Sequence, residues 1–207
     1  MISLSPTHVT VIMGRPREFE MEQVLDAALE AFWAGGYHAT SLTDLENATG
    51  LKRGSLYKAF PDKKAIFLAA VERYRQYGRG ITAKIRAKGD TPRQALANFF
   101  TAIASQSCGP DGRKGCFFVN TIAETSNRDP EIAAEVKTAS QDFERGLATI
   151  IQEGQDSGDI PSRRPASTLA KHLFYQIAAI KIAGENNEDS GFIDQLAHNA
   201  LAVLDAV

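Results

Sequence analysis

Helical periodicity without any strand pattern is the feature that most limits what this chain can fold into. After Pro16, apolar residues recur at helical spacing, and no alternating run between turn residues indicates a β-strand. Capping residues, glycines and prolines divide the sequence into about nine segments, so we expect an all-α protein. The expected helices span residues 20–34, 41–49, 52–60, 63–88, 91–107, 117–126, 130–156, 166–184 and 191–206.

Charge is distributed unevenly along the chain, although the net charge is only −2. Residues 52–88 carry a net charge of +9, whereas residues 1–51 carry −5 and residues 89–207 carry −6. A basic block inside an acidic chain suits a polyanion, because each phosphate that it neutralises releases counterions. A solvated helix face rich in arginine explains the charge equally well.

Several other classes of protein are disfavoured by the sequence. No apolar run approaches the roughly 18 residues that span a bilayer, and the first twelve residues do not form a secretory signal. Two cysteines are too few for a disulfide framework, so we expect a cytoplasmic protein. The cysteines and histidines lack metal-ligand spacing, and no phosphate-binding glycine motif occurs. We expect no metal, no cofactor and no enzymatic activity.

The stretch from Ser41 to Phe60 carries the functional signal. It predicts two short helices joined by a turn at Gly50, the arrangement of a helix-turn-helix unit, whose second helix enters the DNA major groove. Residues at the start of that helix face base edges, and residues around it reach phosphates. The candidates are Lys52, Arg53, Gly54 and Ser55 for the bases, and Tyr57, Lys58 and Lys63 for the phosphates. An αα-hairpin with a basic, solvated face would show the same spacing.

The run from Phe19 to Phe67 resembles the N-terminal domain of the tetracycline-repressor (TetR) family. The matching residues are Ala27-Ala28, Phe32, Gly36-Tyr37, Thr40-Ser41-Leu42, Ala48, Gly50-Leu51, Gly54-Ser55-Leu56-Tyr57, Phe60 and Lys63. The resemblance implies a dimeric transcriptional repressor that binds double-stranded operator DNA and is released by a small-molecule effector. It adds Thr40 and Ser41 to the candidate DNA contacts. Lys52 departs from the family pattern, since many members have there a small hydroxyl residue that caps the third helix.

The resemblance also suggests how the chain is divided. We expect a flexible arm at 1–17, a helix-turn-helix domain at 18–64 with its motif at 41–60, a connecting helix at 65–88, and an effector-binding and dimerisation domain at 89–207. Arg15 and Arg17 resemble the basic arm of some family members, which lies in an A·T-rich minor groove. A disordered leader is the alternative, and Met13 is an alternative start.

The C-terminal part offers candidates for an effector pocket. The segment from Gly115 to Thr121 resembles the start of helix six in one large TetR subgroup, and the family's effector pocket lies in this domain. Apolar residues with few polar groups suit such a pocket, and ordinary core packing is the alternative for each of them. The candidates are Phe99, Phe100, Ile103, Phe117, Phe143, Leu147, Phe174, Tyr175 and Ile177.

Cys108 and Cys116 suggest a different kind of sensor. They flank a glycine-rich loop that contains Arg113 and Lys114, and cationic neighbours make a thiol more reactive. A redox- or electrophile-sensing regulator of the same fold is therefore an alternative. The other interpretation is a buried cysteine and an incidental exposed thiol. A helical adaptor that binds only protein is a further alternative to a DNA-binding regulator.

Dimerisation is expected through the last two helices. Their apolar stripes together are wider than packing on one domain requires, and two DNA half-sites require a symmetric pair of recognition helices. The alternative is a monomeric core that covers both stripes. The candidate interface residues are Leu169, Leu173, Ile177, Ile180, Ile193, Leu196, Ala200, Leu201, Val203 and Leu204.

Overall fold

The fold is all-α, as the sequence predicts. The structure is a computed structural model that describes residues 15–205, and in this part it contains nine α-helices, two short 3₁₀-helices and no β-strand. The helices are α1 (Arg15–Ala39), α2 (Leu42–Thr49), α3 (Arg53–Ala59), α4 (Lys63–Arg86), α5 (Pro92–Ser107), α6 (Phe117–Thr125), α7 (Pro130–Ser157), α8 (Ala166–Glu185) and α9 (Ser190–Ala200). The 3₁₀-helices are η1 (Pro110–Lys114) and η2 (Leu201–Leu204).

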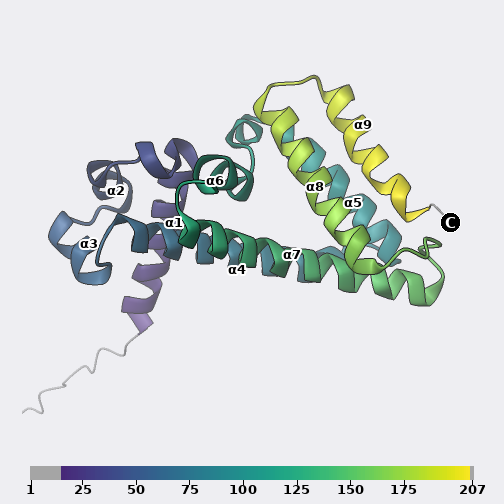
Figure 1. Ribbon diagram of the computed structural model, residues 1–207, viewed down its shortest axis with the longest axis horizontal. Coiled ribbons are helices and arrows are strands. Elements are labelled where there is room, and N and C mark those ends of the chain that lie inside the picture. Colours follow the sequence, from purple (N-terminus) through teal and green to yellow (C-terminus); the bar gives the residue numbers. More distant parts are fainter. Residues whose placement is uncertain (1–14, 206–207) are drawn as a thin grey trace, which may run out of the picture.

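Two long helices connect the two ends of the molecule. In Figure 1, α1, α2 and α3 gather at one end, and α5, α8 and α9 gather at the other. Helices α4 and α7 lie side by side and run between these two groups, with α6 packed against α1 and α7. The helix-turn-helix segment therefore lies at the opposite end of the molecule from α9.

Capping residues fix where most helices begin. Ser41 and Asp44 form a capping box at α2, and Gly50 ends this helix in the left-handed conformation with φ 70°. Asp62, Thr91, Asp129 and Asp189 each accept a backbone N–H at the start of α4, α5, α7 and α9. Because these signals are local, the predicted boundaries of α2 to α8 agree with the structure to within two residues, whereas α1 is longer than predicted and α9 ends at Ala200, where η2 follows.

The N-terminal boundary differs from the prediction. Arg15 and Arg17 belong to α1, whereas we expected them in a flexible arm; the rest of that arm, residues 1–14, lies outside the described residues. Pro16 does not prevent the helix, since proline is tolerated in a first helical turn. Gly36 breaks α1 with φ 76°, close to the predicted end, and a short turn continues to Ala39.

Two separate hydrophobic cores divide the molecule differently from the predicted domain boundaries. One core joins the helix-turn-helix end to α6 and the first half of α7, through Phe117, Phe118, Ile132 and Val136. The other core contains α5, the second half of α7, α8 and α9. Part of the segment that we assigned to the C-terminal domain therefore packs with the helix-turn-helix domain.

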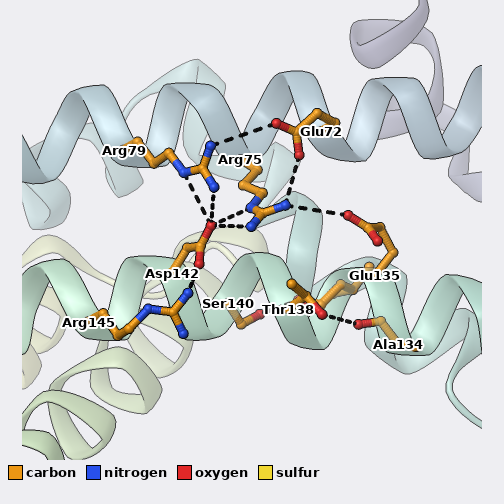
Figure 2. A network of polar contacts seen from close by, with 10 residues as sticks. Glu72, Arg75, Arg79, Ala134, Glu135, Thr138, Ser140, Asp142 and Arg145 are labelled. Atoms are coloured by element: carbon orange, nitrogen blue, oxygen red, sulfur yellow. Dashed lines mark hydrogen bonds and ion pairs between the residues drawn. The ribbon is translucent and has the colours of Figure 1, made fainter.

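A polar network joins the middle of α4 to α7 (Figure 2). The Asp142 carboxylate, only 7% exposed, binds the guanidinium groups of Arg75, Arg79 and Arg145. Arg75 Nε lies 2.5 Å from Asp142 Oδ2, and Arg75 also contacts Glu72 and Glu135. A single carboxylate on α7 thus holds two arginines of α4.

No helix in the described part of the chain is long and apolar enough to cross a membrane.

Candidate nucleic-acid interface

Helix α3 presents one continuous polar face to the surroundings. The exposed residues of α3 and its N-cap are Ala59 and the six predicted ones: Lys52, Arg53, Gly54, Ser55, Tyr57 and Lys58. Leu56, which is 1% exposed, anchors the opposite side of the helix in the core together with the fully buried Leu45 of α2. Gly54 has no atom within 4 Å of the position that a Cβ would occupy, so internal packing does not require a glycine here.

Aromatic side chains of α1 and α4 pack in the core beneath the buried side of α3. Phe32 of α1 and Phe67 of α4 meet edge to face with ring centroids 4.9 Å apart, in the core that also holds Leu45 and Leu56. The two helices of the motif therefore rest on α1 and α4. A rigid base of this kind can hold the α3 side chains in a fixed register along a duplex.

The position of Arg53 is set by two contacts. Its guanidinium carbon lies 5.5 Å from the centroid of the Tyr57 ring, one helical turn further along. Its backbone N–H donates to Glu46 Oε1 at 2.6 Å. Sequence reasoning did not identify Glu46, because the contact crosses the turn between two helices and no local capping pattern marks it.

Five of the eleven cations of the basic block form ion pairs away from the α3 face. Lys64, Arg73, Arg75, Arg79 and Arg86 of α4 each form an ion pair with an acidic residue of α1 or α7, or of the turn that precedes α7. In the part of the chain that the structure describes, no ion pair joins Lys52, Arg53 or Lys58 to an acidic side chain. The net charge of residues 52–88 therefore overstates the positive charge that remains without an acidic partner around α3.

Lys63 lies in a different environment from the one we expected. Its Nζ donates to the His38 carbonyl at 3.1 Å and lies 5.0 Å from the centroid of the Tyr37 ring. Partial burial lowers its pKa from the ordinary value, while the Glu124 carboxylate acts in the opposite direction. Its ammonium group is directed to the end of α1, so we revise its expected role as a phosphate contact.

Thr40 and Ser41 also have internal roles. Thr40 is 2% exposed, and its hydroxyl donates to the Gly36 carbonyl at 2.7 Å. Ser41 Oγ accepts the Asp44 N–H at 3.1 Å in the capping box. These two side chains shape the entry into α2, and we revise their expected role as direct DNA contacts.

A joint that the sequence did not reveal connects α6 and the segment before it to the end of α1. Glu124 accepts the backbone N–H groups of Tyr37 and His38, at 2.8 and 2.6 Å. The Lys114 carbonyl accepts Trp33 Nε1 at 2.8 Å. The two contacts hold the last turn of α6 and the end of η1, which precedes it, against α1.

The candidate effector residues do not form one pocket. Phe99, Phe143 and Phe174 make a row of rings with centroid separations of 6.4 and 6.3 Å, and Phe100, Ile103 and Leu147 are buried in the same core. Ile177 packs against this core, partly buried. Phe117 belongs to the other core. The Tyr175 ring lies 5.5 Å from the Phe174 ring, at the end of the row, but Tyr175 is 59% exposed and lies outside the core.

The expected dimer residues are corrected by their burial. Seven of them lie in the core that a single chain forms from α5, α7, α8 and α9: Leu169, Leu173, Ile180, Ile193, Ala200, Leu201 and Leu204. Leu196, Val203 and Ile177 are partly buried against the same core. The apolar side chains that α8 and α9 leave exposed are Tyr175, Ile182 and Phe192.

The two cysteines occupy different surroundings and are both free thiols. Cys108 is exposed and lines an open pocket of about 460 Å³ with Arg113 and Glu188. Cys116 is half-buried at the start of α6, with its Sγ 3.8 Å from the Tyr74 hydroxyl. Burial, followed by the neighbouring Cys116, raises the pKa of Tyr74 well above its ordinary value.

An all-α fold with an exposed helix-turn-helix unit is the architecture of a DNA-binding regulator. Comparison with known proteins agrees with this class. Residues 24–70 match the family described as "Bacterial regulatory proteins, tetR family", and residues 92–191 match "Tetracyclin repressor-like, C-terminal domain".

Individual relatives match almost the whole chain. The HTH-type transcriptional repressor ComR of Escherichia coli (strain K12) is 32% identical over 189 residues, which cover 91% of this chain and 90% of ComR. A TetR-family regulator from Cytophaga hutchinsonii has the same fold, with a TM-score of 0.78 and 19% identity over 94% of this chain and 96% of the other. The regulator CifR, in a structure with 26-base-pair operator DNA, superposes with a TM-score of 0.69 and 19% identity, covering 87% and 95%.

This chain belongs to the TetR family of transcriptional regulators. It is therefore a DNA-binding regulator of transcription and not an enzyme.

Proposed function

We propose that the protein is a repressor that binds a pseudo-palindromic operator as a homodimer and releases it when a small molecule binds. The exposed face of α3 is the observation that carries this proposal, since its cations are not neutralised by acidic side chains in the described residues. CifR, which has the same fold, was solved with operator DNA. We place the protein in the cytoplasm with the DNA that it binds.

The operator can be identified by selection from a library of genomic fragments that includes the gene's own upstream region. We expect a duplex with two related half-sites whose centres are about 34–36 Å apart, or a multiple of this distance. Salt should weaken the binding steeply. A protein that retains no duplex from the library, but captures a protein partner, would instead be a helical adaptor.

The dimer interface in this proposal lies on the exposed apolar face of α8 and α9. Ile182 and Phe192 line an open groove of about 640 Å³ together with Ala179 and Leu196. Tyr175 lies on α8, nearly two turns before Ile182. An exposed apolar surface of this kind is typical of an interaction site, and a two-fold axis would place it against its own copy.

Effector release is proposed to act through α6 and α4. Because α6 shares a core with α1 and α4, a shift of α6 would move the helix-turn-helix domain. A small, largely apolar effector that binds the C-terminal domain should lower operator affinity, and operator should lower effector affinity by the same factor. Calorimetry of an effector, found by screening for DNA release, tests this. Equal affinity with and without operator would contradict it.

The Glu124 joint provides a matched variant for that calorimetry. Glu124→Ala removes both acceptors from the Tyr37 and His38 N–H groups. We expect this variant to bind effector normally but to show weaker coupling between effector and operator. Thr138→Ala, at an exposed site on α7, is the control and should keep the wild-type coupling.

A cysteine-based switch is the second candidate, favoured by the position of Cys116. Its Sγ lies beside Tyr74 at the start of α6, close to the Trp33–Lys114 contact. Hydrogen peroxide would convert a thiol into a sulfenic acid with release of water. Peroxide should then release DNA from the wild type and from Cys108→Ser, but not from Cys116→Ser. Retained release by the double serine variant would eliminate both cysteines as sensors.

A further inference from the structure

The start of recognition helix α3 lacks the capping side chain that a short helix needs. The N–H groups in the first turn of a helix have no partner within that helix, and Ser, Thr, Asp or Asn at the N-cap satisfies one of them. Here the N-cap is Lys52, whose side chain has no oxygen and makes no capping hydrogen bond. Its carbonyl accepts Ser55 N–H and Leu56 N–H, at 2.8 and 3.1 Å.

The missing cap is supplied from the other helix of the motif. Glu46, in the last turn of α2, places Oε1 2.6 Å from the backbone nitrogen of Arg53, the first residue of α3. The backbone carbonyl of the same residue accepts the Gly50 N–H at 3.0 Å, which closes α2 at its left-handed glycine. Glu46 therefore holds both ends of the turn between the two helices.

A carboxylate at this place carries a cost for DNA binding. Its negative charge favours the positive end of α3 but opposes the approach of phosphates. The charge lies one hydrogen bond from Arg53, which is at the exposed start of the helix. Such a group lowers affinity for every duplex, whereas the geometry that it imposes matters only where bases are read.

We infer that Glu46 is a positioning residue for operator recognition: it caps α3 in place of Lys52 and thereby holds Arg53 and Ser55 in the register needed to read bases. This inference rests on the proposed operator binding. The capping hydrogen bond of Glu46 then affects the ratio of operator affinity to random-duplex affinity. The charge of Glu46 affects both affinities alike.

Three variants separate these effects. Glu46→Gln keeps a carbonyl acceptor and removes the charge, so both affinities should rise and their ratio should stay within about twofold. Glu46→Ala removes the acceptor, so the ratio should fall roughly fivefold, the equivalent of a cap worth about 1 kcal/mol. In the Glu46→Ala background, Lys52→Ser should recover more of the ratio than Lys52→Ala, because both lose the lysine and only serine can cap.

The measurement is fluorescence anisotropy with a duplex selected by the wild type and a scrambled duplex of equal length. Unchanged ratios in both Glu46→Ala and Glu46→Gln would overturn the inference. An equal fall in both would also overturn it, since the carboxylate would then read a base itself. No difference between the serine and alanine variants at position 52 would exclude the capping role.

Amide hydrogen exchange of Arg53 in the free protein tests the cap without DNA. We expect exchange to quicken roughly fivefold in Glu46→Ala and to stay near the wild-type rate in Glu46→Gln. If the wild type binds no duplex but the exchange rates behave in this way, the cap is real and the proposed function is wrong. If the exchange rates do not differ, the inference fails whatever the DNA binding shows.

Discussion

At the scale of single residues, we expect neighbouring side chains of α3 to have different roles in DNA binding. Arg53 stands at the exposed start of the helix with its backbone fixed by Glu46 and its guanidinium over the Tyr57 ring. Arginine at such a position can donate two hydrogen bonds to a guanine in the major groove. Lys58 is exposed in the last turn of α3, where a cation reaches phosphates and carries no sequence information.

Replacement of Arg53 by alanine should therefore reduce specificity. We expect Arg53→Ala to cost about 1–3 kcal/mol of operator binding and to relax discrimination at one position of each half-site. Competition binding against operators with each base changed in turn measures this. A variant that keeps the wild-type ratio of operator to random-duplex affinity would contradict the role of Arg53 in reading bases.

A comparison of alanine substitutions at Lys58 and Lys63 tests which of these lysines contacts phosphates. Lys58→Ala should weaken binding to all duplexes alike and lower the slope of log affinity against log salt by about one. Lys63→Ala should leave this slope unchanged, because its ammonium binds the His38 carbonyl. Titrations at four salt concentrations decide between them. A loss of slope in Lys63→Ala instead would restore the role that the sequence alone suggested.

At the scale of helices, one nearly buried carboxylate joins the middle of α4 to α7. Asp142 is 7% exposed and binds two arginines of α4 and one of its own helix (Figure 2). Glu135, in the same network, is 38% exposed and lies 3.7 Å from Arg75. Removal of a buried partner leaves unpaired charge, whereas an exposed pair contributes little.

Asp142→Asn should therefore destabilise the protein much more than Glu135→Gln. We expect a loss of about 1–3 kcal/mol in the free energy of unfolding for the first, and within about 0.5 kcal/mol for the second. Urea denaturation followed by circular dichroism measures both. Equal effects of the two substitutions would show that the burial of Asp142 does not set its contribution.

The helix boundaries could be predicted from the sequence because their causes are local. Ser41 with Asp44, Gly50, and Asp129 with Pro130 act on backbone groups a few residues away. The exposed face of α3 could be predicted for the same reason, since Leu56 and Phe60 are its large aliphatic and aromatic anchors and lie four residues apart. Contacts between distant segments were not predictable: Lys63 Nζ meets the His38 carbonyl, and Glu124 meets the Tyr37 N–H, only after the helices have packed.

At the scale of the whole molecule, the two cores determine which surfaces remain for a partner. The sequence showed that the apolar stripes of α9 are wider than packing on one domain requires, but not which of their residues the chain itself covers. Ile193, Leu201 and Leu204 are buried in the core that this chain forms by itself, so the expected interface shifts to Ile182 and Phe192, which are 52% and 43% exposed. This face is continuous across α8 and α9 along the groove that they line.

Charge placed on that face should disrupt the proposed dimer. Ile182→Glu and Phe192→Glu should each raise the dimer dissociation constant on the order of 100-fold, since a two-fold axis buries each new carboxylate twice. Ile81→Glu, at an apolar side chain of α4 that is 42% exposed, is the control and should stay dimeric. Sedimentation at micromolar concentration gives the result. Dimers of unchanged stability in both α8–α9 variants would place the interface elsewhere.

The central claim is that the α3 face reads a specific DNA sequence, and one titration tests it most directly. Wild-type protein is titrated against its selected duplex and a scrambled duplex of equal length over a series of salt concentrations. We predict tighter binding to the selected duplex by at least about 10³-fold, with affinities for both duplexes that fall steeply as salt rises. Equal affinity for the two duplexes, or binding that salt does not change, would contradict the claim.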